Sequence, residues 1–386
     1  MKQKKRKENK STEKELVRGV IYDSEPPEDE EIEESFYDPK KTKTTLDGLA
    51  TVSRKVKESV AFIDDKQLRV IIDNYYQTQS NRIKTQNQIR AVEQGYDDSD
   101  NMPAMMWLLY NHENAENQIK KMIETYTDAV PVCKWAKSII GIGPMFSAIL
   151  WDAIDMEKCN HANQFLNYCG QNNNNIPWLG KEKAEQYVNE AYNCCGLKKS
   201  DDVNDNIIIF LCGKTGRKFE TILRGFESQK ERDTQNSSDR TLLIKYLSKP
   251  PYNKNLKNVC YLIGESFCKF SNRGSLYGRL YRERKAWETM RNENFEYREQ
   301  AEHLLATKNY DKTTATYKCL IQGKLSPGHI DQRAKRWATK IFLTHFFEAC
   351  WIYKHGTGSK PPVIYPIEFM GHTDYIEPEV PYSNYI

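Results

Sequence analysis

Apolar residues recur at intervals of three and four along most of the chain, the spacing that places them on one face of an α-helix. A first stripe runs from about 62 to 94, and the polar run at 95–100 breaks it. A second helix is predicted after the break, with Asn101 as its N-cap and Pro103 in its first turn, where proline is tolerated. The two stripes consist of Leu68, Ile72, Tyr75, Tyr76, Ile83 and Ile89, followed by Met105, Leu108, Leu109, His112, Ala115, Ile119, Met122, Ile123 and Tyr126.

The second stripe is close to a heptad seam, so we expect an antiparallel helical hairpin that forms an arm and supports a homodimer. His112 lies on the apolar stripe and is expected to pack there rather than to bind a metal.

The pattern as a whole predicts an all-α fold. We divide the chain into a charged tail (1–50), the helical-hairpin arm (51–130), a helix-hairpin-helix segment (131–170), a helical insertion (171–250), C-terminal helices (251–355) and an extended tail (356–386). The first tail is expected to be disordered, because its basic start and the acidic block at 25–34 cannot bury enough apolar surface to offset the entropy of ordering. The proline- and tyrosine-rich last segment is expected to pack in extended form or to bind a partner as a strap.

The most informative segment, residues 132–150, is typical of two helices joined by a tight Gly-Ile-Gly turn. Glycine allows a sharp turn and a close backbone approach, and the apolar residue between the glycines can fill the junction. The exposed amides that begin the second helix can bind a phosphate oxygen, which holds a DNA backbone without reading its sequence. The residues expected to contact DNA here are Lys137, Gly141, Ile142, Gly143 and Met145. The alternative is a helix junction that uses glycine only to turn.

Further blocks follow the Gly-Ile-Gly-Pro turn. They are Trp151–Met156, Asn163–Gly170, Asn253–Val259, Leu276–Lys285 and Arg333–Leu343. In this order they resemble the C-terminal transposase domain of insertion-sequence family 110/116/902, a group that includes the Piv and MooV DNA invertases. The resemblance extends over the chain in pieces, and the turn is its most specific part.

The resemblance implies a domain organisation and an activity. Members of that family carry an N-terminal RuvC-like domain with a four-carboxylate DEDD metal site, a coiled-coil arm, and a C-terminal domain with a serine nucleophile; RNA-guided DNA recombination is known among them. The arm at 62–128 would correspond to the coiled coil. We expect the RuvC-like domain to be absent, because it needs several strands and well over ~100 residues, and a charged tail precedes the arm.

The family's serine would fall just before the block at 253, where this chain has its insertion. Ser237, Ser238 and Ser248 are available by position. A serine needs a base or a metal-bound scaffold to act as a nucleophile, and neither is recognisable beside them. We therefore favour a protein without catalysis of its own, although an active recombinase with an unrecognised or trans-supplied site remains an alternative. Within the insertion, two short helices around a glycine turn in the run 212–220 are predicted, either as a second DNA contact or as a packed excursion.

Two later segments place cations beside aromatic residues. The residues expected to contact DNA in them are Arg273, Arg279, Arg282, Lys285, Arg333, Arg336 and Lys340. The cations at 279, 282 and 285 share one helical face. The last three lie on a helix predicted at 331–351, largely away from the apolar side that carries Trp337, Ile341, Phe342 and Ala349. Cations in this arrangement suit phosphates, and the alternative is a solvated basic face.

Composition adds little about the partner, because the net charge of +4 comes from 57 basic and 53 acidic residues. The basic start is not followed by an apolar stretch, and no run of about 18 apolar residues could span a membrane, so we expect a cytoplasmic protein without a membrane partner. The ten cysteines show neither disulfide-framework nor zinc spacing, and we expect no metal and no cofactor.

These features predict a transposase-like accessory factor of DNA recombination or transposition that holds the backbone of duplex DNA. A scaffold for structured RNA and a plain oligomerisation module remain alternatives.

Overall fold

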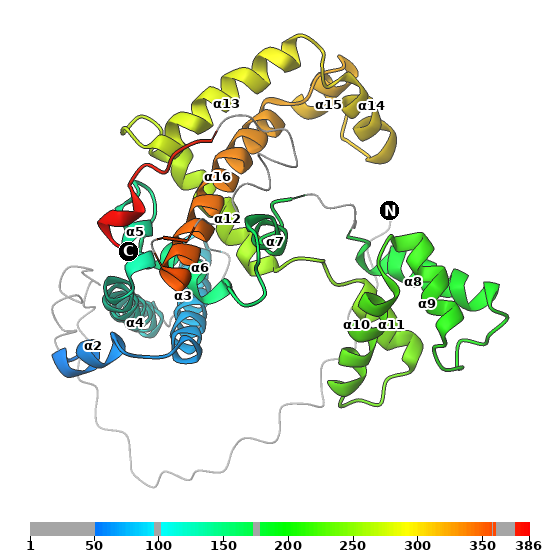
Figure 1. Ribbon diagram of the computed structural model, residues 1–386, viewed down its shortest axis with the longest axis horizontal. Coiled ribbons are helices and arrows are strands. Elements are labelled where there is room, and N and C mark those ends of the chain that lie inside the picture. The colour runs from blue at the N-terminus through cyan, green and yellow to red at the C-terminus, as the bar shows by residue number, and fades with distance from the viewer. Residues whose placement is uncertain (1–50, 96–101, 173–177, 357, 360–374) are drawn as a thin grey trace, which may run out of the picture. The chain divides into compact units, whose positions relative to one another are not determined.

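The computed structural model of the protein describes residues 51–95, 102–172, 178–356, 358–359 and 375–386. The tail expected at 1–50, the cap expected at Asn101 and the prolines at 361 and 362 lie outside these residues. The described part of the chain is all-α, with α-helices, one 3-10 helix and no strand (Figure 1). Among its helices, none combines the length and the apolar character needed to cross a membrane.

The helices, in chain order, are α2 (Arg54–Val60), α3 (Asp65–Glu93), α4 (Met102–Ala129), α5 (Pro131–Ser138), α6 (Pro144–Ala153), α7 (Ala162–Tyr168), α8 (Gly180–Cys194), α9 (Asp205–Thr215), α10 (Phe219–Glu231), α11 (Asp239–Leu247), α12 (Lys254–Lys269), α13 (Leu276–Glu293), α14 (Arg298–Thr307), α15 (Ala315–Ile321), α16 (Pro327–His355) and the 3-10 helix η2 (Tyr382–Asn384).

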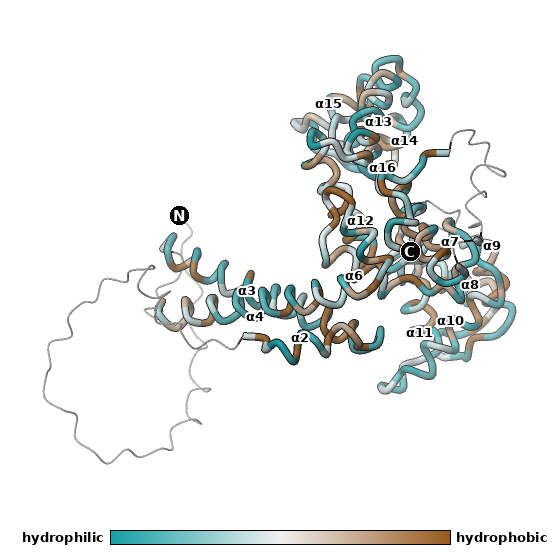
Figure 2. Tube along the Cα trace, turned by 60° about the vertical axis from the view of Figure 1, so that its left-hand side comes forward, coloured by the Kyte–Doolittle hydropathy of each residue, from teal (hydrophilic) through white to brown (hydrophobic). Residues whose placement is uncertain are grey.

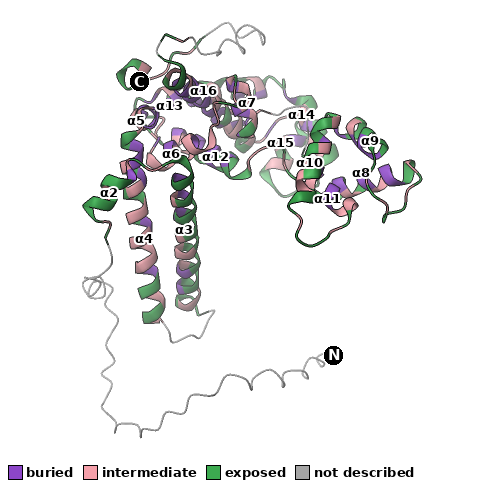
Figure 3. Cartoon of the chain, turned by 60° about the horizontal axis from the view of Figure 1, so that its bottom comes forward, coloured by how far each residue is buried: buried purple, intermediate pink, exposed green. Residues whose placement is uncertain are grey.

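The two long helices α3 and α4 lie side by side (Figure 3). α3 begins with a capping box, in which the Asp64 side chain accepts a hydrogen bond from the Gln67 amide and the Gln67 side chain accepts one from the Asp64 amide. Toward α6 the two helices share an apolar core, whose buried members from the arm are Val60, Leu68, Ile72, Tyr75, Ile123 and Tyr126.

Farther along this pair, a polar contact replaces the apolar core. The side chain of Glu116, only 5% exposed, accepts hydrogen bonds from Arg82 Nε at 2.6 Å and from the Tyr75 hydroxyl at 3.1 Å. The expectation of a continuous apolar seam was wrong at Tyr76, Ile83 and Leu108, which are exposed. A straight helix with 3.6 residues per turn drifts from a seven-residue repeat, and short apolar and polar stretches consequently alternate along both helices (Figure 2).

The largest core forms around α16, which packs against α5, α7, α12 and α13. Ser326 caps its first turn, and Pro327 occupies the first helical position. The buried ring of Phe342 lies 5.6 Å from that of Phe267 and 5.4 Å from that of Tyr277, measured between centroids. Edge-on contacts between buried aromatic rings hold α12, α13 and α16 together.

The four helices α8–α11 have a core of their own. Its fully buried members include Val188, Leu211, Ile222 and Leu243. The glycine turn predicted within 212–220 lies at Gly216, whose φ is +66°, between α9 and α10, whereas Gly213 lies inside α9. Glycine adopts that left-handed conformation without a steric cost, so the chain reverses one residue after α9 ends.

Residues 375–386 pack against the largest core. Trp135 Nε1 donates a hydrogen bond to the Val380 carbonyl at 2.8 Å, and the Tyr382 hydroxyl donates to Glu348 Oε2 at 2.6 Å. The side chains of Ile376, Val380, Tyr382 and Ile386 complete the apolar contact. The C-terminal segment was expected either to pack in extended form or to bind a partner as a strap. Its described part packs within the chain.

Candidate nucleic-acid interface

The turn between α5 and α6 is fastened to α12. Gly141 has φ +99°, a conformation that L side chains rarely adopt, and its carbonyl accepts a hydrogen bond from Ser266 Oγ at 2.7 Å. A Cβ on Gly141 would lie 3.0 Å from that same Oγ. Ile142 is 5% exposed and belongs to the apolar core. The glycine at 141 and the buried isoleucine thus fix the turn, and neither side chain position faces solvent.

The other side of the turn is open. Gly143 caps α6 without any side-chain hydrogen bond, and a Cβ placed on it would meet no atom within 4 Å. The first amides of a helix have no partner inside the helix, and Met145 and Phe146, in the first turn of α6, both border this space. A cavity of about 720 Å³ lies there between α4 and α6, lined by Asn114, Asn117, Gln118, Lys120, Lys121, Glu124, Gly143, Pro144, Met145 and Phe146.

Several of the cations expected to contact DNA are held by neighbouring side chains instead. Lys137 Nζ lies 2.6 Å from Asp128 Oδ1, and Lys285 Nζ lies 2.7 Å from Asp331 Oδ1. Arg282 donates a hydrogen bond to Asn272 Oδ1 at 2.8 Å. These three cations are therefore poorer candidates for phosphate binding than their positions on the helices indicate.

Arg273 and Arg279 are exposed and have no ion-pair partner in the described part of the chain. The Arg273 guanidinium lies 5.2 Å from the centre of the Phe270 ring. The structure does not gather these two arginines with the other predicted cations.

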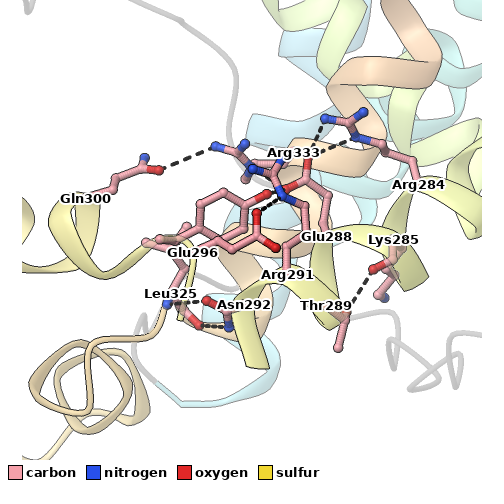
Figure 4. A network of polar contacts seen from close by, with 11 residues as sticks. Arg284, Lys285, Glu288, Thr289, Arg291, Asn292, Glu296, Gln300, Leu325 and Arg333 are labelled. Atoms are coloured by element: carbon pink, nitrogen blue, oxygen red, sulfur yellow. Dashed lines mark hydrogen bonds and ion pairs between the residues drawn. The ribbon is translucent and has the colours of Figure 1, made fainter. Parts of the chain in front are cut away.

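The densest group of cations lies where α13 packs against α16. Its centre is Glu288, whose side chain is buried at 1% exposure and accepts hydrogen bonds from Arg284, Arg333 and Tyr297 (Figure 4). The distances from Arg284 Nη2 and from Arg333 Nε to the carboxylate are both 2.7 Å. We call the six residues that line the adjoining cavity of about 170 Å³ the α13–α16 basic site: Arg284, Glu288, Arg333, Arg336, Trp337 and Lys340.

Within this site, Arg336 and Lys340 lie one helical turn apart and make no ion pair with any described residue. Partial burial, and then the positive charges of Arg336 and Arg284, lower the pKa of Lys340. Partial burial and the charge of Arg333 lower the pKa of Arg336, which stays fully charged at neutral pH. Burial is the larger cause of both shifts, and the neighbouring positive charges act in the same direction. The lining of the cavity holds four cations and one carboxylate, so its charge is not balanced.

Burial alone would raise the pKa of Glu288, but the hydrogen bonds from Tyr297, Arg333 and Arg284 outweigh it, and the net shift is downward. Glu288 is thus ionised at neutral pH and neutralises one of the four positive charges around it. A phosphate group, with its several acceptor oxygens and its negative charge, matches what remains.

The sequence prediction missed part of this site. Arg284 and Glu288 were not among the predicted DNA contacts, although their spacing of four residues on a helix is a signal for an ion pair. Trp337 was predicted as core, whereas the structure places it both against the core and in the lining of the cavity. Trp287 is 40% exposed, and its ring lies 4.1 Å from the Arg284 guanidinium.

The three candidate serines serve local structure. The Ser238 side chain caps α11, Ser248 Oγ donates to the Lys245 carbonyl, and Ser237 Oγ donates to Asp233. No group of three or more histidine, cysteine, aspartate or glutamate side chains that could hold a metal occurs among the described residues.

Searches for similarity to protein-family models, to curated proteins and to solved structures find no match for this chain.

Proposed function

We propose that the protein binds nucleic acid, with duplex DNA as the first candidate, and that the α13–α16 basic site holds a backbone phosphate. The observation that supports this most directly is that Arg336 and Lys340, beside two further arginines, have no ion-pair partner in the described part of the chain. Like charges at this distance destabilise each other unless an anion sits between them, and the cavity leaves space for one.

In this proposal Glu288 has a positioning role. It binds Arg284 and Arg333 from the buried side. Arg333 Nη1 also donates a hydrogen bond to Gln300, and the N–H groups of the two arginines that make no such bond are available to a ligand in an arrangement that is set before binding. Such preorganisation reduces the entropy lost when a ligand binds. Arg336 and Lys340 would add the uncompensated charge.

The turn between α5 and α6 would supply a second phosphate contact through the amides at the start of α6. This is the helix-hairpin-helix role expected from the sequence, and the open space at Gly143 is compatible with it. With the resemblance to insertion-sequence transposases, it supports a role as an accessory factor in recombination or transposition that acts without catalysis of its own. Dimerisation through α3 and α4 belongs to the same proposal.

The test is binding of a fluorescent duplex DNA across a salt series. The variant Arg336→Gln/Lys340→Gln is compared with wild type and with Lys181→Gln/Lys183→Gln, which removes the same charge from two exposed positions of α8. Each lost phosphate contact lowers the slope of log K against log salt by about 0.9, so the first variant should lose up to about 1.8 and the control nothing.

Equal slopes for both double variants would show that net charge, not this site, governs binding, and would contradict the proposal. Structured RNA of matched length is measured in parallel. If RNA binds more tightly and the same two residues control its slope, the site is an RNA site and the RNA-scaffold alternative replaces duplex DNA.

A further inference from the structure

Phe295 stands directly after α13 in a backbone conformation that suits glycine. Its φ is +60°, and among described residues other than glycine only Asn236 shares a positive φ. Asparagine tolerates the left-handed region well, whereas a bulky residue there is strained.

The hydrogen bonds around Phe295 explain why the chain takes this conformation. The Glu296 amide donates to the Arg291 carbonyl and the Phe295 amide donates to the Asn292 carbonyl, both at 3.1 Å. This pair of bonds is the Schellman motif that ends many helices, and the position that Phe295 occupies in it is usually glycine. The backbone conformation thus favours glycine at this position. The turn does not explain why the residue is a phenylalanine.

Packing does not explain the side chain. The ring of Phe295 is 44% exposed and belongs to none of the apolar cores, although the neighbouring Tyr297 is buried in one. Two cations lie beside the ring instead: Lys324 Nζ at 4.9 Å and the Arg298 guanidinium at 5.3 Å from its centre. Lys324 also forms an ion pair with Glu293, whereas Arg298 has no ion-pair partner among the described residues, so Arg298 is the better candidate for a phosphate contact. An exposed aromatic ring flanked by cations is the arrangement that single-stranded nucleic acid uses, since the ring stacks on a base and the cations meet its phosphates.

Phe295 follows the C-terminal end of α13, the helix that carries Arg284 and Glu288 of the basic site. From Arg284 to the end of α13 is roughly 14 Å at 1.5 Å per residue. Arg291 lies on α13 between the two, with its guanidinium 4.4 Å from the Trp287 ring and 5.1 Å from the Tyr297 ring, and Glu296 balances its charge in an ion pair. Cations and aromatic rings therefore follow one another from the basic site to Phe295.

We propose that Phe295 is a stacking residue for an unpaired base, so that the preferred ligand is DNA with a gap or another unpaired nucleotide rather than an intact duplex. This inference rests on the proposed function, because the phosphates next to that base would be held by the α13–α16 basic site.

The experiment compares wild type with three variants at this position on two DNA duplexes of the same sequence, one intact and one with a one-nucleotide gap opposite an unpaired base. Phe295→Gly removes the ring and relieves the backbone, Phe295→Leu keeps an apolar side chain without a ring, and Phe295→Trp keeps a ring. Phe62→Leu is the matched control, because Phe62 is 89% exposed and has no positive φ.

Wild type should prefer the gapped duplex by roughly 5- to 150-fold, the range that stacking of one base on an aromatic side chain provides. The Gly and Leu variants should lose this preference, whereas the Trp variant and the Phe62 control should keep it. The melting temperature of Phe295→Gly should not fall below that of wild type, because the glycine fits the turn.

Three results would overturn the inference. The first is a preference that survives in Phe295→Gly and Phe295→Leu, and the second is a marked loss of thermal stability in Phe295→Gly, which would make Phe295 a packing residue. The third is a preference for unpaired nucleotides that depends on Phe295 in single-stranded RNA but not in the gapped DNA duplex. If instead wild type binds intact DNA with the salt slope set by Arg336 and Lys340 but shows no preference for the gap, the inference fails while the proposed function stands.

Discussion

Replacing Glu288 by glutamine tests how the α13–α16 basic site is built. The substitution keeps the shape of a side chain that is 1% exposed, but it removes the one negative charge among four cations. Breaking a buried ion pair by removing one partner costs about 3–5 kcal/mol. Arg284 and Arg333 are each about a quarter exposed, so water screens part of the exposed charge and we expect the lower end, about 3 kcal/mol.

For a chain of this size, about 3 kcal/mol corresponds to a fall in melting temperature of about 4 °C, which circular dichroism resolves. Inorganic phosphate should restore part of the loss, because the anion takes over the charge of the missing carboxylate. At ten times its Kd, a ligand that binds only the folded state adds about 1.4 kcal/mol. The rescue should be larger in Glu288→Gln than in wild type, and Glu227→Gln on the exposed face of α10 should show neither effect.

The same variant has a pH signature. The pKa of Glu288 lies below its ordinary value near 4.5, so its contribution to stability is present above that value and is lost as the pH falls through the lowered pKa. The difference in stability between wild type and Glu288→Gln should therefore be constant from pH 6 to 8, and it should shrink below about pH 4. A variant as stable as wild type at pH 7 would refute the positioning role of Glu288. A destabilised variant without a larger response to phosphate would refute the anion site.

Two further predictions concern other parts of the chain. Glu348 is 1% exposed, and burial raises its pKa to about 7. Wild type should therefore lose stability as the pH rises from 4.5 to 7. In urea unfolding between pH 5 and pH 8, the free energy of unfolding of Glu348→Gln should rise relative to that of wild type, by up to about 3 kcal/mol. A Cβ on Gly225 would lie 1.9 Å from the Tyr246 ring, whereas one on Gly213 meets nothing within 4 Å. Gly225→Ala should thus destabilise the α8–α11 core by about 1–3 kcal/mol, while Gly213→Ala, inside α9, should stabilise it slightly; equal melting temperatures for the two variants would contradict this packing.

Local signals account for what the sequence predicted well. The stripe from 62 to 94 corresponds to α3, and the Gly-Ile-Gly-Pro run corresponds to the turn that follows α5 and to the first residue of α6. Each of these depends on residues within four positions of one another, through helical periodicity, capping or the conformational freedom of glycine. In the insertion, the sequence did not show which of two glycines, Gly213 or Gly216, makes the turn, because a glycine is tolerated inside a helix.

The candidate site was harder to predict, because whether a cation is available depends on acids that are distant in the sequence. Lys285 lies on a basic helical face, but packing of α13 against α16 brings Asp331 to it from 46 residues away. The same packing brings Glu288 to Arg333 across 45 residues and leaves Arg336 and Lys340, farther along α16, with no acid of their own. A count of positive charges along the sequence ranks all of these residues alike. The physical difference between them is the presence of a carboxylate partner among the described residues. Arg336 and Lys340 lack one, so a bound external anion stabilises these two cations the most.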